Sequence, residues 1–121
     1  MAESFRVSES EWVHFSNGAV EALFRAWLLI ARSRDEPGMP ILADLLEQRL
    51  ESGLGCRAFD LFDAPLPEEL ESSDCRAALR CVLSETIHDV HLISDVNWDD
   101  ELAQSWRERL LAIQQGLQLL E

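Results

Sequence analysis

Apolar side chains recur every three or four residues along most of this chain, a spacing that gathers them on one face of an α-helix. The longest such segment runs from Trp12 to Arg34, and it is apolar around most of its circumference. Ser8 and Glu11 stand at capping-box spacing just before it, so we expect the first helix to begin there. The pair Asn17 and Gly18 marks a point at which this helix can be interrupted.

Three shorter segments carry the same helical pattern. It predicts a second helix over residues 40–52 and a third over residues 74–94. Asn97 or Asp99 is expected to cap a fourth helix, whose apolar residues repeat at spacings of three and four. Between the second and third helices, residues 54–66 lose the period. Their aromatic and acidic side chains favour a packed loop, with a strand or a short helix as the alternatives.

The composition favours one hydrophobic core. Of the 121 residues, 47% are hydrophobic, and four Trp and five Phe supply large side chains. A chain of this length buries about two thirds of its unfolded surface, so its stability requires neither a metal nor a disulfide. We predict an all-α fold, a compact bundle of about four main helices, as a single domain over residues 1–121. We expect its core to contain Trp27, Leu79, Leu83, Trp106 and Leu110.

The net charge narrows the class of partner. The chain carries 23 acidic residues against 10 basic ones, which gives a formal charge of −13, and every basic residue is Arg. A field of this sign repels nucleic acids and anionic membranes, and it attracts cationic proteins at rates that fall as salt rises. We therefore expect a basic protein partner, and neither a nucleic-acid nor a membrane partner.

The cysteines and the apolar runs indicate the cellular compartment in which the protein is expected to act. Cys56, Cys75 and Cys81 cannot all pair within one chain, and no basic region followed by an apolar stretch of signal-peptide length stands at the N-terminus. The longest uninterrupted apolar run, residues 26–31, is far shorter than the roughly 20 residues that span a bilayer. These features predict a protein of the reducing cytoplasm.

Two Glu-x-x-His pairs invite a metal hypothesis, because di-iron four-helix bundles repeat this motif. The pairs are Glu11 with His14 and Glu85 with His88. In a helical projection both pairs turn away from the apolar faces, whereas a dinuclear site needs them inside the bundle. We therefore predict that the protein has no metal cofactor.

A second group of residues is compatible with a site for one metal ion. His88, His91 and Asp95 are spaced to form one stripe on a helix, where they would either ligate a metal or remain solvated. The sequence shows no glycine-framed nucleophile and no phosphate-binding loop. We therefore expect no catalytic residues and no cofactor, and a protein that is not an enzyme.

Two acidic stretches are the strongest functional signal. Six acids and no basic residue lie between Arg57 and Arg76, and six more lie between Arg80 and Arg107, with Trp98 among them. Acids interleaved with aromatic and aliphatic residues are typical of an interface that steers a basic partner and anchors it by burial. The predicted partner-binding residues are Asp60, Asp63, Glu68, Glu69, Glu71, Asp95, Trp98, Asp99, Asp100 and Glu101.

Size, acidity and the lack of catalytic motifs fit the physical type of an immunity protein that neutralises a basic bacterial toxin, most directly a nuclease. A secretion chaperone or adaptor for an effector is the alternative, because that class is also small and acidic. A metal-dependent helical-bundle enzyme that uses His14, His88 or His91 is a third hypothesis. Leu111 and Leu119 are expected to be exposed on the last helix, which leaves a homodimer open.

Overall fold

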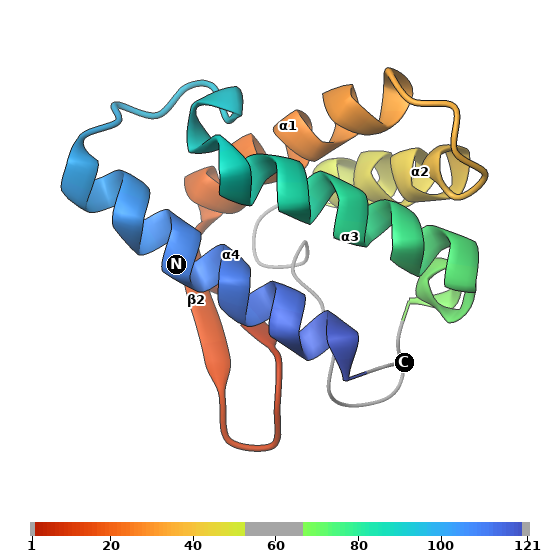
Figure 1. The fold of residues 1–121 in the computed structure, drawn as a ribbon, viewed down its shortest axis with the longest axis horizontal. Helices are drawn as coiled ribbons and strands as arrows, with labels where there is room; N and C mark the ends of the chain where they lie inside the picture. Colours follow the sequence, from red (N-terminus) through yellow and green to blue (C-terminus); the bar gives the residue numbers. More distant parts are fainter. Residues whose placement is uncertain (1, 53–66, 120–121) are drawn as a thin grey trace.

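The computed structural model describes residues 2–52 and 67–119, which form a bundle of four α-helices with a small antiparallel sheet (Figure 1). Two short 3-10 helices, η1 and η2, complete the described elements. In chain order the elements are β1 (Ala2–Arg6), β2 (Trp12–Ser16), α1 (Asn17–Arg32), α2 (Met39–Glu51), η1 (Glu68–Glu71), α3 (Ser73–His88), η2 (Val90–Leu92) and α4 (Asp100–Gln118). The predicted bundle of four main helices is confirmed. The predicted loop over residues 54–66 falls outside the described residues.

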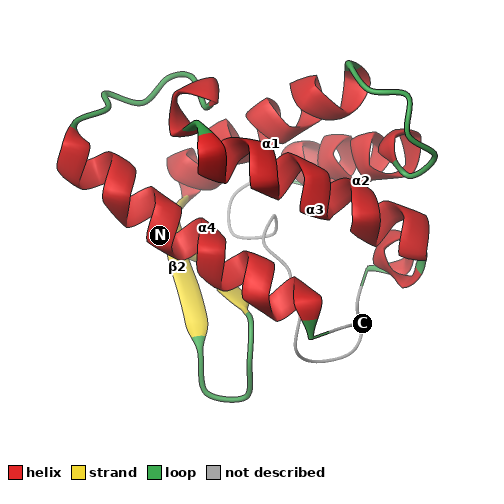
Figure 2. Cartoon of the chain, in the orientation of Figure 1, coloured by secondary structure: helices red, strands yellow, loops and turns green. Residues whose placement is uncertain are grey.

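The N-terminal segment is a β-hairpin, where the apolar pattern predicts a helix (Figure 2). β1 and β2 pair antiparallel, and in the turn the Val7 N–H donates to the Glu11 carbonyl oxygen at 3.1 Å. Burial alternates along β2, with Val13 and Phe15 buried and the residues beside them exposed. The predicted helix start at Ser8 is therefore wrong. A two-residue period, typical of a half-buried strand, lies inside the longer apolar segment.

α1 begins at Asn17, the point at which the sequence permits an interruption. Ser16 caps it, because the Ser16 hydroxyl accepts a hydrogen bond from the Ala19 N–H at 3.1 Å. Half of the residues of α1 are buried, a larger share than in α2, α3 or α4. The first helix is thus shorter than predicted, but it is the most buried of the four described helices.

α3 lies at the centre of the bundle and contacts α1, α2 and α4. In Figure 1 it crosses in front of α2, while α4 runs beside it and the hairpin extends away from the helices. The predicted core is confirmed: Trp27, Leu79, Leu83, Trp106 and Leu110 all belong to one buried apolar cluster. The Trp27 indole N–H donates to the Thr86 hydroxyl at 3.2 Å, which satisfies a buried polar group between α1 and α3.

α3 ends at His88, earlier than the predicted end at residue 94. Asp89 adopts an extended backbone conformation, and its carboxylate accepts a hydrogen bond from the His91 N–H at 3.0 Å. This local bond competes with continuation of the helix and starts η2 instead. Val90 and Ile93 are nevertheless buried, as the apolar pattern predicts.

Arg109 and a close approach at Gly116 help to attach the hairpin to α4. The Arg109 Nη1 donates to the His14 carbonyl oxygen at 3.0 Å, and the guanidinium lies 4.4 Å from the centre of the Phe15 ring. Burial lowers the pKa of Arg109 from its usual value. Gly116 lies so close to Val7 that an added Cβ would stand 2.8 Å from the Val7 Cβ. The hairpin therefore depends on contacts far away in the sequence.

α4 begins where one of the two predicted caps stands. The Asp99 carboxylate accepts a hydrogen bond from the Leu102 N–H at 2.7 Å. Leu111 and Leu119 are exposed as predicted, with 41% and 71% of their surface accessible. Among the helices of residues 2–52 and 67–119, none is both long and apolar enough to cross a membrane.

Candidate functional site

The two acidic stretches lie at opposite ends of α3. Residues 68–71 form η1 just before this helix, and residues 89–101 follow it. α3 has 16 residues, and at 1.5 Å per residue it separates the two stretches by roughly 24 Å. Asp60 and Asp63, predicted as partner-binding residues, lie outside the described residues. The described acids therefore form two separate surfaces.

In the first stretch, the chain supplies its own cation. Glu68 and Glu71 are exposed on η1, and Leu70 between them is fully buried. Arg76, one turn into α3, folds back over η1, and its Nη1 donates to the carbonyl oxygens of Leu70 and Glu71 at 2.9 Å each. This guanidinium offsets part of the negative charge that an incoming basic partner would meet.

Glu69, the third acid of η1, is half-buried, and its charge affects the pKa of a buried thiol. The Cys75 thiol lies under the start of α3, and its pKa is raised from 9.0 to about 11. Burial is the largest cause, the charge of Glu69 adds to it, and Arg76 opposes it. The first stretch is thus partly engaged by the fold.

In the second stretch, a short connection carries the acids over an aromatic layer. Trp98 is half-buried, and its indole N–H donates to the Ile93 carbonyl oxygen at 3.0 Å. The Trp98 ring packs edge-on against Trp106 with ring centres 5.1 Å apart, and Trp106 lies 5.0 Å from Phe15. Trp98 therefore holds the connection against α4, and only part of its ring is exposed to a partner.

Asp95 stands at the sharpest bend of this connection. Its φ is 65°, in the left-handed region, and within residues 2–52 and 67–119 it is the one non-glycine residue with positive φ. Asp and Asn tolerate this conformation better than most side chains do. The bend leaves the Asp95 carboxylate exposed above α1 and α4.

The acids at the start of α4 are exposed. Asp99 is the N-cap, and Asp100 and Glu101 occupy the first turn, where the positive end of the helix dipole stabilises negative charge. Asp95, Asp100 and Glu101 form no ion pair with any residue in the described parts of the chain. Their charges therefore remain available to a partner.

Asp95, Asp99 and Glu101 border a groove between the start of α1 and the start of α4, which we call the acidic groove. It consists of two hollows of about 410 and 330 Å³ that share Leu102, with a smaller one of about 70 Å³ beside them. Val96, Leu102 and Trp106 supply its apolar surface. The ionisable residues that line it are Glu21, Arg25, Asp95, Asp99 and Glu101.

The groove includes side chains that the sequence pattern misses. Glu21 comes from α1 and lies beside Asp95 in the smallest hollow, although the two residues are far apart in the sequence. Arg25, the basic residue in the lining, is held by Glu21, with 2.7 Å between its Nη2 and the Glu21 Oε1. Asp95, Asp99 and Glu101 were predicted as partner-binding residues, and the structure brings these three to one groove.

The Glu-x-x-His pairs do not share a site. His14 lies on β2, not on a helix, and its Nδ1 is 2.6 Å from the Ser4 hydroxyl oxygen. His88, His91 and Asp95 do not form the predicted helical stripe, because α3 ends at His88. Over residues 2–52 and 67–119, no group of three His, Cys, Asp or Glu side chains is placed to hold a metal ion.

Comparison with protein-family models, with curated proteins and with solved structures finds no match for this chain. The acidic groove is therefore interpreted from its own chemistry.

Proposed function

We propose that this protein is a non-catalytic acidic binding protein that neutralises a basic protein partner, in the manner of an immunity protein acting on a nuclease toxin. The observation that carries the proposal is the acidic groove, where Asp95, Asp99 and Glu101 surround an apolar surface. Cys75 and Cys81, the cysteines within the described ranges, are free thiols, which supports action in a reducing cytoplasm.

Charge and apolar surface have separate roles in this proposal. The net charge of −13 raises the rate at which a cationic partner arrives, and carboxylates at the groove rim orient it. Val96 and Leu102 then offer half-buried apolar surface, and burial of such surface slows dissociation. Carboxylates in this arrangement resemble the phosphates that a nuclease binds, which favours a nuclease as the partner.

The groove is a better candidate than η1 because of its electrostatics. At η1, Arg76 already lies over the backbone beside Glu71. At the groove, the lining contains four acids and one Arg, and that Arg is paired with Glu21. An approaching cation therefore meets a more negative surface at the groove.

The test compares two triple variants with equal loss of charge. The groove variant carries Asp95→Asn, Asp99→Asn and Glu101→Gln. Asn preserves the bend at residue 95 and the helix cap at residue 99. The control variant carries the substitutions Glu68→Gln, Glu69→Gln and Glu71→Gln.

The partner is first isolated by affinity capture from the native host at low salt, and its binding kinetics are then measured with purified protein. We expect the groove variant to associate about 10-fold more slowly and with a flatter salt dependence, because steering depends on uncompensated charge. The control variant should bind like the parent. Equal slowing in both variants would show that only the overall charge matters, and no slowing in either would reject the proposed interface.

A further inference from the structure

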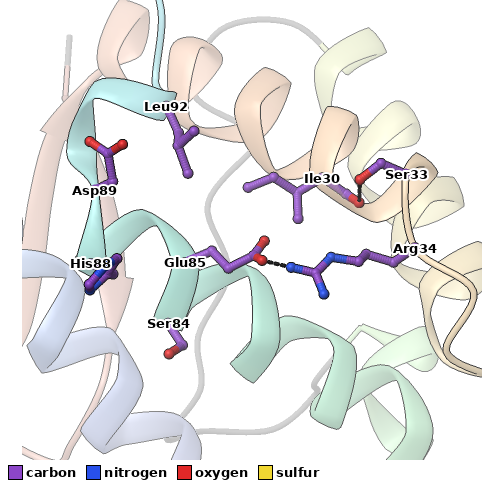
Figure 3. A pocket seen from close by; sticks show the side chains of 8 residues that line it. All are labelled: Ile30, Ser33, Arg34, Ser84, Glu85, His88, Asp89 and Leu92. Carbon is purple, nitrogen blue, oxygen red and sulfur yellow. Dashed lines mark hydrogen bonds and ion pairs between the residues drawn. The ribbon is translucent and has the colours of Figure 1, made fainter.

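Another hollow, of about 540 Å³, is lined by the last turns of α1 and α3 and the residues that follow them, and it shares no lining residue with the acidic groove (Figure 3). We call it the α1–α3 pocket. Its volume falls in the range of small-molecule sites, about 300 to 1,000 Å³. It is lined by Ile30, Ser33, Arg34, Ser84, Glu85, His88, Asp89 and Leu92.

Two side chains of the α1–α3 pocket are large and aliphatic. Figure 3 shows the side chains of Ile30 and Leu92 facing each other across it, above Glu85. Leu92 has 47% of its surface exposed, whereas its neighbours in the same turn, Val90 and Ile93, are fully buried. A large exposed aliphatic side chain at the rim of a hollow gives an apolar ligand surface to cover.

The lining also contains an ion pair that joins α3 to the connection after α1. Glu85 lies on α3, and its carboxylate is paired with the Arg34 guanidinium, as the dashed line in Figure 3 marks. Arg34 follows the end of α1, in the connection to α2. Its Nη1 also lies 3.8 Å from the Glu36 Oε1, so the guanidinium keeps an acidic partner when Glu85 binds another cation.

The charge of the lining favours a cationic ligand. With His88 counted as neutral, Glu85 and Asp89 contribute two carboxylates, and Arg34 contributes one guanidinium. The chain's own guanidinium already occupies Glu85, which shows the chemistry that this carboxylate accepts. A planar guanidinium or amidinium group can bind a carboxylate through two parallel hydrogen bonds.

We propose that the α1–α3 pocket binds a guanidinium or amidinium cation carried on a small apolar body. The cation replaces Arg34 at Glu85, Arg34 remains beside Glu36, and Ile30 and Leu92 cover the apolar body. This site is separate from the acidic groove, and the proposal does not depend on the function proposed for that groove.

Three probes of the same shape test the charge preference: benzamidine, benzamide and benzoate. Binding is measured by the change of backbone amide chemical shifts on titration. We expect benzamidine to bind with a Kd of about 0.1 to 1 mM, the range for so few atoms, and to shift the amides of residues 30–34 and 84–92. Benzamide and benzoate should bind at least about 10-fold more weakly. Equal or tighter binding of benzoate would overturn the proposal.

Two substitutions with opposite expected effects test the exchange of cations. Glu85→Gln should weaken benzamidine binding about 10-fold or more, because it removes the anion. Arg34→Gln should strengthen it a few-fold, because it removes the internal competitor. A loss of binding in Arg34→Gln, with the fold intact by circular dichroism, would show that Arg34 holds the ligand and would overturn the proposal.

Controls separate this pocket from general acidity. Asp95→Asn with Glu101→Gln removes two charges from the acidic groove and should leave benzamidine binding unchanged. If this pair weakens binding as much as Glu85→Gln does, the probe senses only the net charge and the proposal fails. Leu92→Ser should weaken binding a few-fold by removing the apolar contact, and unchanged binding there would contradict the assigned role of Leu92.

A further arm identifies the source of the cation with acetyl-arginine methylamide, which carries an arginine side chain without an aromatic body. Binding within about 3-fold of benzamidine would indicate that an arginine of a protein can fill the pocket. Binding of benzamidine alone would indicate a free small molecule. Either outcome supports the pocket, and failure of both probes rejects it without bearing on the acidic groove.

Discussion

The acids of η1 and those around the acidic groove look alike in the sequence and differ in the structure. At η1, Arg76 hydrogen-bonds to the backbone beside Glu71, and Glu69 acts on the buried Cys75. At the groove, Asp95 and Glu101 form no ion pair with any residue of the described ranges. A stretch without basic residues in the sequence can therefore still be partly neutralised by a residue that folds back onto it.

The two regions also differ in what lies beneath the charges. η1 contains the buried aliphatic side chain of Leu70, whereas the groove lies over packed aromatic rings: Trp98 packs edge-on against Trp106, and Trp106 packs at a tilt against Phe15. Leu70, Trp106 and Phe15 are all buried, whereas Trp98 is half-buried and leaves part of its ring for a partner to cover. The groove combines available charge with available apolar surface, and η1 has less of both.

The largest expected effect comes from removing the aromatic support of the groove. Trp106→Ala should lower the free energy of unfolding by about 3 to 5 kcal/mol, because it leaves a cavity between the hairpin, α4 and Trp98. Chemical denaturation measures the loss. Trp106→Phe should cost less, since it retains part of the ring contact. A Trp106→Ala variant as stable as the parent would show that this aromatic layer does not support the groove.

The second effect tests whether η1 acts on the protein interior. The folded-state pKa of Cys75 is raised to about 11, so its contribution to stability is complete below pH 9 and is lost as the pH rises from 9 to 11. This rise in the pKa of Cys75 corresponds to a loss of about 2 to 3 kcal/mol in the free energy of unfolding. Denaturation at several pH values should show this loss in the parent and a smaller one in Cys75→Ala.

Two further variants sharpen that titration. Glu69→Gln should lower the pKa of Cys75, because it removes a neighbouring negative charge. Cys81→Ala should leave the pH dependence that Cys75 causes unchanged. If Glu69→Gln leaves the titration of Cys75 unchanged, the charge of Glu69 does not act on the buried thiol. The proposed difference between η1 and the groove would then be wrong on this point.

A smaller effect concerns the one groove acid with a defined structural role. Asp99→Ala should lower the free energy of unfolding by about 1 kcal/mol, because the Leu102 N–H loses its hydrogen-bond acceptor. Asp99→Asn should retain the cap and most of that stability. The difference between Ala and Asn in chemical denaturation isolates the cap from the charge. Equal stability of the parent, Asp99→Ala and Asp99→Asn would mean that Asp99 does not stabilise the helix as a cap.

The smallest effect is the response of stability to charge removal. The groove triple variant should gain about 1 to 2 °C in Tm at low salt, because it relieves repulsion that no described cation offsets. The η1 triple variant should gain less, because Arg76 already offsets part of that charge. The difference should disappear in about 1 M salt, where screening acts over roughly 3 Å. A larger gain in the η1 variant would reverse the comparison.

Features that depend on neighbours within one or two helical turns can be predicted from the sequence. The apolar period places α2, α3 and α4 and identifies core residues such as Trp27 and Leu83. Asp99 could be recognised as a cap because a cap bonds to the next turn of its own helix. The net charge and its two acid-rich stretches are likewise properties of the sequence alone.

The hairpin and the two binding surfaces depend on how distant segments pack, and they could not be predicted from the sequence. The alternation around Val13 and Phe15 is hidden in a segment that also fits a helix, and it is resolved by packing and by the bond from Arg109, 95 residues away, to His14. Glu21 joins Asp95, and Arg34 joins Glu85, because the connections that carry Asp95 and Arg34 lie against α1 and α3. Helix propensity is set by local backbone and side-chain contacts. The side chains that share a surface are set by how whole helices pack, and no local pattern records that arrangement.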